Sequence, residues 1–224
     1  MSHEYRPPNS GLTAGRVAAL HMPSRPTHVI IRLVETSETL VARLHTSGIL
    51  LQQDPLLPNV VTLMAGMPVR GSWWTHSDAH RIYDCLNEIT QHPDVLVTRL
   101  VRGKITFVHR RLWADVLAVA CSHAPWQVAG LSESAHKLYE DVERQGILFS
   151  SGPGAKEIAR RLLVHDEQVH TPAGHHELRL ESWSLWAERV TCPGTRTASE
   201  GLQGLEAVLR ALGGTIAMLP CPAS

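Results

Sequence analysis

Long apolar runs are missing from the sequence, and their absence bears on where the protein works. No stretch reaches the roughly 18 consecutive apolar residues that are needed to span a bilayer. The N-terminus, MSHEYRPPNSGLTAGR, is polar and broken by prolines, so it lacks the apolar core of a secretory signal. We therefore expect a cytoplasmic protein without a membrane partner.

Cysteine and the familiar enzyme signatures are also scarce. The four cysteines lie far apart and include no Cys-x-x-Cys pair, so the sequence indicates neither a disulfide framework nor a zinc ribbon. It contains no phosphate-binding loop, no dinucleotide fingerprint, no Gly-x-Ser-x-Gly elbow and no His-Glu-x-x-His pair. We expect no cofactor and no metal site, and few enzyme classes remain open.

Net charge is absent as well, because 21 basic residues balance 21 acidic ones. This balance disfavours a protein that coats nucleic acid indiscriminately. A local basic patch is still allowed, because salt screens charges beyond about 8 Å. The stretch VTRLVRGKITFVHRRLW, residues 97–113, is such a patch, with five cations and no carboxylate: Arg99, Arg102, Lys104, Arg110 and Arg111.

Local patterns around this stretch predict helices and a hairpin. SETLVARLHTSG is predicted to form a helix that Thr36 or Ser37 caps and Gly48 stops. A proline-rich connection follows, and then HSDAHRIYDCLNEITQHPD, whose apolar residues recur at helical spacing. β-Branched residues on either side of Arg-Gly predict a hairpin that turns at Gly103. LWADVLAVACS then predicts another helix.

A second copy of this order follows the break HAPWQVAG. SESAHKLYEDVERQG predicts a helix that Ser132 caps and Gly146 ends. GPGAKEIARRLLV predicts a helix that starts at Pro153, with cations largely away from its apolar side. EQVHTPAGHHELRLESW is a second hairpin candidate, and a tryptophan-bearing helix comes directly after it.

Helix, helix and hairpin in this order are the layout of a winged helix. Its second helix can enter the major groove, and its hairpin, the wing, lies along the phosphates. The sequence therefore predicts an α+β, mostly helical fold of tandem winged-helix modules with two-stranded β-hairpin wings. We expect a flexible N-terminal arm at 1–30, a helical segment and proline-rich connection at 31–74, a first winged-helix-like module at 75–123, a second winged-helix module at 130–192, and a C-terminal helix and tail at 193–224.

The density of cations on the first hairpin suggests a function. Duplex DNA carries about one negative charge per 1.7 Å of axis, and each phosphate that a cation neutralises releases counterions. We expect binding of double-stranded DNA, with the oligomeric state left open. The alternative is that the cations protect a strand edge or are simply solvated. The expected nucleic-acid-binding residues are Arg99, Arg102, Lys104, His109, Arg110, Arg111, Lys156, Arg160, Arg161 and Trp74.

The sequence resembles a group of largely uncharacterised bacterial winged-helix proteins. These proteins are related to the winged-helix DNA glycosylases that unhook interstrand crosslinks. The resemblance is carried by four segments: GSWW, LVRGKITFVHRRLW, RRLLVHDEQVHT and LESWSLWAERV. The resemblance covers about residues 37–190. It implies DNA binding by tandem winged helices, with base excision in DNA repair as an alternative function. The glycosylases themselves are longer chains with a third winged module.

A short motif would carry the excision chemistry. The glycosylases use Gln-x-Gln or Gln-x-Asp, and LLQQDP offers Gln52 and Asp54 in that spacing. The resemblance assigns them to positioning water and stabilising the developing sugar cation. The favoured alternative is an ordinary turn, in which Asp54 hydrogen-bonds locally before Pro55.

Histidines gather on the second hairpin, at His165, His170, His175 and His176. His165 and His170 are an odd number of positions apart, so they point to opposite faces of a continuous strand. A solvated or phosphate-binding wing is therefore favoured over a metal site. A third function, a protein-interaction module whose wings contact another protein, also stays open.

Tryptophans stand at the boundaries of the predicted elements. Trp73 and Trp74 could stack on an unpaired base or wedge into a duplex. Paired tryptophans at a boundary more often bury one ring and half-bury the other, so we expect Trp73 in the core and leave Trp74 open. Trp113, Trp183 and Trp186 are expected to anchor the core.

Overall fold

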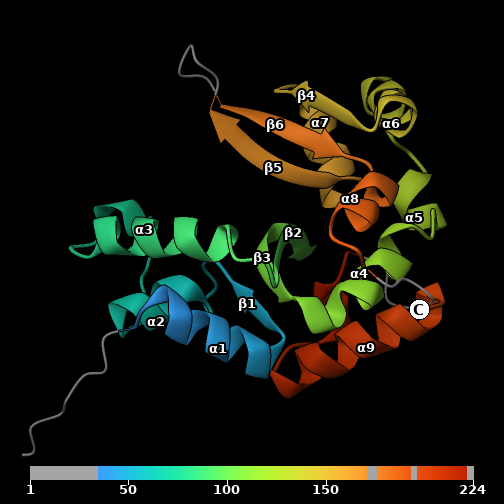
Figure 1. The fold of residues 1–224 in the computed structure, drawn as a ribbon. Coiled ribbons are helices and arrows are strands. Elements are labelled where there is room, and N and C mark those ends of the chain that lie inside the picture. The colour runs from blue at the N-terminus through green and yellow to red at the C-terminus, as the bar shows by residue number, and fades with distance from the viewer. Residues whose placement is uncertain (1–34, 171–175, 193–195, 221–224) are drawn as a thin grey trace, which may run out of the picture. The chain divides into compact units, whose positions relative to one another are not determined.

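The computed structural model of the chain describes residues 35–170, 176–192 and 196–220. Within these residues, helices predominate and the strands form two small three-stranded antiparallel sheets (Figure 1). This is the α+β, mostly helical class that the sequence predicts. The expected arm at 1–30 lies outside the described residues. None of the described helices has the length and apolar character that a membrane crossing requires.

The first sheet belongs to a module of three helices and three strands. In chain order these are α1 (Ser37–Ser47), β1 (Ile49–Leu51), α2 (Val60–Ala65), α3 (Ala79–Thr90), β2 (Val95–Val101) and β3 (Lys104–His109). Strand β3 is central, with β1 and β2 on either side. Leu44, Ile82 and Phe107 share one core, which joins α1, α3 and β3. The module therefore begins at α1, whereas the sequence analysis placed its start at residue 75.

Local signals explain these elements. The side chain of Thr36 accepts a hydrogen bond from the N–H of Thr39 at the start of α1, and Gly48 ends the helix at φ 80°. Arg102 and Gly103, with φ of 52° and 65°, form the tight turn between β2 and β3. The predicted cap, stop and hairpin turn are confirmed.

The second sheet belongs to a smaller module. It runs α6 (Glu133–Gln145), β4 (Ile147–Ser150), α7 (Pro153–Arg160), β5 (His165–His170) and β6 (His176–Glu181), with β6 central. Ser132 caps α6, Gly146 follows its end and Pro153 opens α7, as predicted. One helix stands between the first strand and the hairpin, where the first module has two. A short helix, α5 (Pro125–Val128), precedes the module.

A third set of helices follows the two hairpins in the chain. These are α4 (Trp113–Ala120), α8 (Trp183–Arg189) and α9 (Ala198–Ala211). Trp113, Trp183 and Trp186 are buried, and the ring centroid of Trp186 lies 5.1 Å from that of Trp113 and 5.6 Å from that of Trp183. The prediction that these tryptophans anchor the core is confirmed. Their cluster also contains residues of β1, β2 and α9.

Gly201 lets α9 approach α4 closely. A Cβ at this position would lie 2.6 Å from the carbonyl oxygen of Asp115 and 3.0 Å from the Cβ of Ala118. We expect Gly201→Ala to lower the free energy of unfolding by about 1–3 kcal/mol, because α9 must move away from α4. Urea denaturation measures the change. Ser199→Ala, on the exposed side of α9, is the control, and a neutral or stabilising Gly201→Ala would contradict the close packing.

Candidate nucleic-acid interface

The basic hairpin formed by β2 and β3 uses its cations for contacts within the molecule. Nε of Arg99 lies 2.9 Å from Oδ2 of Asp166 on β5. Nη1 of Arg110 lies 3.2 Å from Oδ1 of Asp94. Arg111, in the η2 turn (Arg110–Leu112), donates from Nη2 to a carbonyl oxygen in the last turn of α1 at 3.2 Å. These three predicted DNA contacts are therefore already paired with protein oxygens.

The tip of the hairpin lies against Asp54, the predicted catalytic carboxylate. Nη2 of Arg102 is 2.5 Å and Nζ of Lys104 is 2.8 Å from Oδ2 of Asp54. The backbone N–H of Arg102 also donates to the carbonyl oxygen of Met218, in η3 (Ile216–Met218), at 2.7 Å. The tip is thus held from two sides, by the β1–α2 connection and by the C-terminal part of the chain.

Asp54 has no exposed side-chain surface. Its Oδ1 accepts hydrogen bonds from the backbone N–H groups of Leu56 at 2.9 Å and Leu57 at 3.0 Å. Burial raises the pKa of Asp54, but the hydrogen bonds from Lys104, Leu56 and Leu57 outweigh burial and lower the pKa to about 2. The structure thus contains the local hydrogen-bonded turn that was the alternative to catalysis. A carboxylate enclosed by four donors is poorly placed to act on a bound sugar.

Gln52 and His109 are also set back from the surface. The N–H of Gln52 donates to the carbonyl oxygen of Ile105, and Gln52 itself is half-buried. His109 is buried, and its Nδ1 accepts a hydrogen bond from the N–H of Arg111 at 3.2 Å. Burial lowers the pKa of His109, and the neighbouring His45 lowers it further. His109 is therefore a poor partner for a phosphate.

The α7 segment supplies the other predicted cations. Nη1 of Arg161, just beyond the helix, donates to the carbonyl oxygen of Ala129 at 2.6 Å. Cγ of Arg160 lies 3.6 Å from where a Cβ on Gly103 would stand, so its stem covers the tip of the first hairpin. Lys156 and Arg160 are exposed, and neither has an acidic partner among the described residues.

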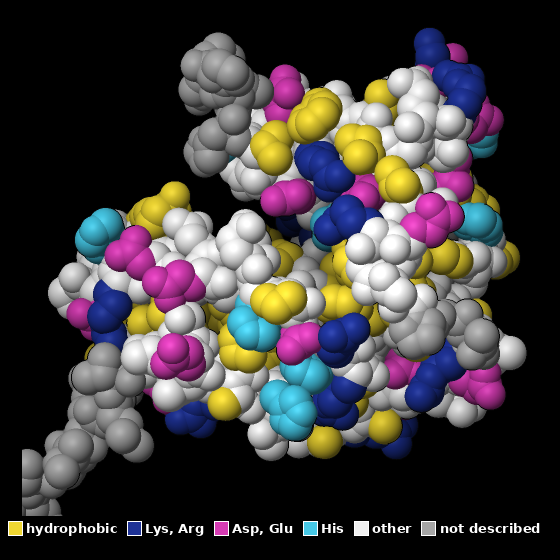
Figure 2. Space-filling model, in the orientation of Figure 1, with side chains coloured by type: hydrophobic (Ala, Val, Ile, Leu, Met, Phe, Trp, Pro, Cys, Tyr) yellow, Lys and Arg dark blue, Asp and Glu magenta, His cyan; other side chains and the backbone are white. Residues whose placement is uncertain are grey.

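Most cations of the described residues are paired in this way. On the face drawn in Figure 2, lysines and arginines are interspersed with aspartates and glutamates. A continuous basic strip that could follow a DNA backbone is not seen on that face. Among residues 35–170, 176–192 and 196–220, the lysines and arginines without an ion pair to Asp or Glu are Arg70, Arg111, Lys137, Lys156 and Arg160.

The tryptophan pair in η1 (Trp73–Thr75) is divided between core and surface. Trp73 is 5% exposed and Trp74 is 60% exposed. Their rings are stacked, with centroids 4.0 Å apart and planes inclined by 24°. Tyr83 of α3 lies 5.5 Å from Trp74 at a tilt. The expected burial of Trp73 is confirmed, and Trp74 is an aromatic surface held in place by the core.

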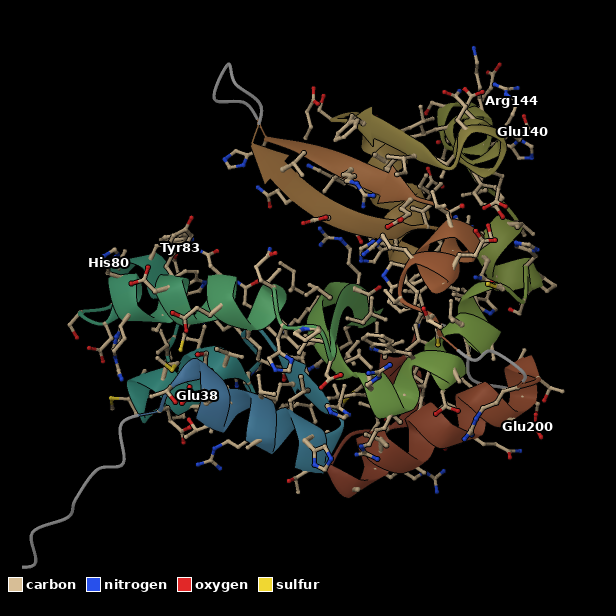
Figure 3. The ribbon with its side chains drawn as sticks, in the orientation of Figure 1. Glu38, His80, Tyr83, Glu140, Arg144 and Glu200 are labelled. Atoms are coloured by element: carbon tan, nitrogen blue, oxygen red, sulfur yellow. The ribbon has the colours of Figure 1, made fainter. Side chains whose placement is uncertain are left out.

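The outer face of α3 is the part of the first module that the sequence analysis missed. We define it by His80, Tyr83 and Asn87, which are exposed, whereas Ile82 and Ile89 on the opposite face are buried. Figure 3 shows His80 and Tyr83 on the side of α3 that points away from α1 and α2. The helical spacing of the apolar residues already defined this face, because the residues between them must be exposed.

A hollow of about 300 Å³ is lined by residues that precede and follow the tryptophan pair in the chain. Its lining loop is held by Gln53, whose Nε2 donates to the carbonyl oxygens of Val69 at 3.2 Å and Gly71 at 2.9 Å. The hollow combines apolar walls with a few polar groups and one arginine. Its lining residues are Met67, Pro68, Val69, Arg70, Ser72, Thr75 and His76.

A second hollow, of about 430 Å³, lies between α1 and the end of α3 and is lined by His45, His92 and His109. Nδ1 of His92 accepts a hydrogen bond from the N–H of Asp94, as Nδ1 of His109 does from Arg111. A neutral ring with an accepting Nδ1 carries its proton on Nε2, so neither Nε2 is free to bind a metal. The described residues hold no group of three or more His, Cys, Asp or Glu that could bind a metal ion.

The second hairpin, where histidines were expected to gather, is described in part. His165 is buried, and Nδ1 of His176 lies 2.6 Å from Nε2 of Gln168. His175 and the side chain of His170 lie outside the described residues. The expectation of a solvated, phosphate-binding wing does not extend to His165, which contacts Trp183 and Trp186 in the core.

Comparisons of the chain with protein-family models, curated proteins and solved structures find no match. The resemblance to winged-helix proteins related to the glycosylases therefore depends on the sequence strings alone. Any function assigned to this chain has to be argued from the geometry described above.

The buried Asp54 makes stability depend on acid pH. We expect Asp54→Asn to lower the free energy of unfolding by about 2 kcal/mol at pH 7, because the folded pKa of about 2 lies below the unfolded value near 3.9. A depressed folded pKa means that this stabilisation is present above about pH 5 and is lost as the pH falls towards 2. Urea titrations of both proteins at several pH values measure the effect.

The matched control for this prediction is Asp94→Asn, which breaks the exposed pair with Arg110 and should cost less than about 1 kcal/mol. The free energies of unfolding of the wild-type protein and of Asp54→Asn should become similar as the pH falls. A difference that stays constant from neutral pH to pH 3 would show that Asp54 is not the titrating group.

Proposed function

We propose that residues 37–109 form a winged helix that binds double-stranded DNA through α3, and that residues 133–181 form a second, reduced winged-helix module. The order helix, strand, helix, helix, strand, strand, with the sheet order β1-β3-β2, supports the first part. In such a module the second helix of the helix-turn-helix pair enters the major groove. That helix is α3.

The outer face of α3 is the observation that carries the proposal. His80, Tyr83 and Asn87 recur at i, i+3 and i+7, so they form one row along a helix of 12 residues. The Asn87 side chain makes no hydrogen bond within the described residues, so both its donor and its acceptor are available. An asparagine on a recognition helix can bind adenine through N6 and N7.

The charges near this face favour contacts to bases over contacts to phosphates. Asp84 and Glu88 are exposed on the same helix, and His80 lies 3.8 Å from Asp84. Arg70, beside the hollow, has no acidic partner in the described part of the chain. A cation count this low predicts a slope of log affinity against log salt of about −1 to −2, whereas five hairpin cations would give about −4 to −5.

Base excision is not part of the proposal, because Asp54 is enclosed and ion-paired. A protein partner is the second candidate, and one feature favours it. Strand β4 is at the outer side of its sheet, and its Phe149 is 59% exposed. An edge strand with exposed apolar side chains and without lysine or proline is a common site for binding an extended peptide.

Two double variants test the DNA proposal. We expect His80→Ala with Asn87→Ala to weaken duplex binding by at least about tenfold, since both remove groups from the row that would face the bases. Fluorescence anisotropy titrations at three salt concentrations measure the affinity and its salt slope. The matched control is His136→Ala with Gln145→Ala, which removes an exposed histidine and an amide from α6 and should leave the affinity unchanged.

The hairpin cations are tested in the same assay. Arg102→Ala with Lys104→Ala should leave affinity and salt slope unchanged while lowering the free energy of unfolding, because both cations bind Asp54. A salt slope reduced by about two would show that the hairpin follows phosphates and that the proposal is wrong about the surface. Failure to bind any duplex would leave the protein partner as the function to pursue.

A further inference from the structure

The exposed ring of Trp74 offers a surface on which one flat group can stack. Its ring is stacked on Trp73, which is 5% exposed and packs in the core of the first module. Trp73 is buried, so the stacked Trp74 ring has little room to turn before any ligand arrives. An aromatic platform of this kind loses little conformational freedom on binding, which favours stacking.

A hollow is lined by the chain neighbours of the tryptophan pair, although neither tryptophan lines it. Ser72 and Thr75, which flank the tryptophan pair in the chain, both line it. Its volume of about 300 Å³ is at the lower end of the range for small-ligand pockets, which suits a single small ring system. Arg70 provides a planar cation at its edge, able to bind a base edge or one phosphate.

We propose that the exposed ring of Trp74 stacks on an unpaired nucleobase, so that the site prefers DNA containing an unstacked base over an intact duplex. The inference rests on the proposed function, because it assumes that the first module contacts DNA. A base within a duplex has both faces covered by its neighbours, whereas an unpaired base leaves the stack at little cost. Trp74 can then take the place of the lost neighbour, as aromatic side chains do in proteins that bind unpaired strands.

The surrounding charges support a base as the ligand. Asp78, at the N-cap of α3, and Asp84, in the middle of the helix, would repel a closely held phosphate backbone. A base carries no formal charge, so its approach to Trp74 is not penalised in this way. Stacking also tolerates any base, because every base has a flat aromatic face.

The test compares two duplexes of one sequence, the first fully paired and the second with a single extra adenine in one strand. We expect the full-length protein to bind the bulged duplex about tenfold more tightly. A 2-aminopurine placed at the bulge should lose fluorescence on binding as it stacks on Trp74. Trp74→Phe should keep most of the preference, because the ring remains planar. Trp74→Leu should abolish it, although the side chain stays apolar.

Leu56→Ala, which removes an apolar side chain that is 71% exposed and belongs to the β1–α2 connection, should leave the preference intact. Equal binding of the two duplexes would overturn the inference while the proposed function stands. A preference that survives Trp74→Leu, or an equal loss on both duplexes, would also overturn it. Failure to bind either duplex would overturn the inference and the proposed function together. Trp74 is exposed, so circular dichroism should show all three variants folded.

Discussion

The structure depends on the burial of one carboxylate, Asp54, against the tip of the β2–β3 hairpin. A buried charge is tolerated only when it is paired and hydrogen-bonded, and Arg102 and Lys104 meet that requirement from the hairpin. Their position fixes the turn, whose backbone N–H then binds the carbonyl oxygen of Met218. In a DNA complex this hairpin would be a free wing. In this structure its tip is instead bound to both the β1–α2 connection and the C-terminal segment.

A second ion pair joins the same hairpin to the smaller module. Arg99, on the same strand as the turn, binds Asp166 on β5, whose side chain is 5% exposed. Thr98 Oγ1, His165 Nδ1 and Asp166 Oδ1 are buried without a hydrogen-bond partner in the described residues, so β2 and β5 carry buried polar atoms as well as apolar side chains. Polar groups that must find particular partners restrict how two surfaces can pack, more than apolar side chains of similar size do.

Much of the local structure could be predicted because its causes are local. The cap at Thr36, the stops at Gly48 and Gly146 and the turn at Gly103 each depend on residues a few positions apart. Strand β1 could not be predicted, since its three residues, Ile-Leu-Leu, are all buried and show no alternation. Because β1 was not predicted, the sequence analysis did not join α1 to the hairpin, whereas in the structure β1 pairs with β3 and α1 shares its core. The candidate site was missed for another reason. The sequence analysis identified the buried face of α3, but it assigned no function to the exposed face.

The basic stretch 97–113 suggested phosphate contacts that most of its cations do not have free charge to make, and the reason applies to other sequences. The stretch itself contains no carboxylate, but Asp54, Asp94 and Asp166 lie 48, 16 and 67 positions away from their respective partners Arg102, Arg110 and Arg99. Local charge density cannot reveal such pairing, because it depends on the fold. Phosphate binding needs cations that remain free after folding, since a cation already held by a carboxylate must lose that partner first. A module with few free cations can still bind DNA, but its affinity has to come from groups that contact bases. We propose that in this chain those groups lie on α3 and at Trp74.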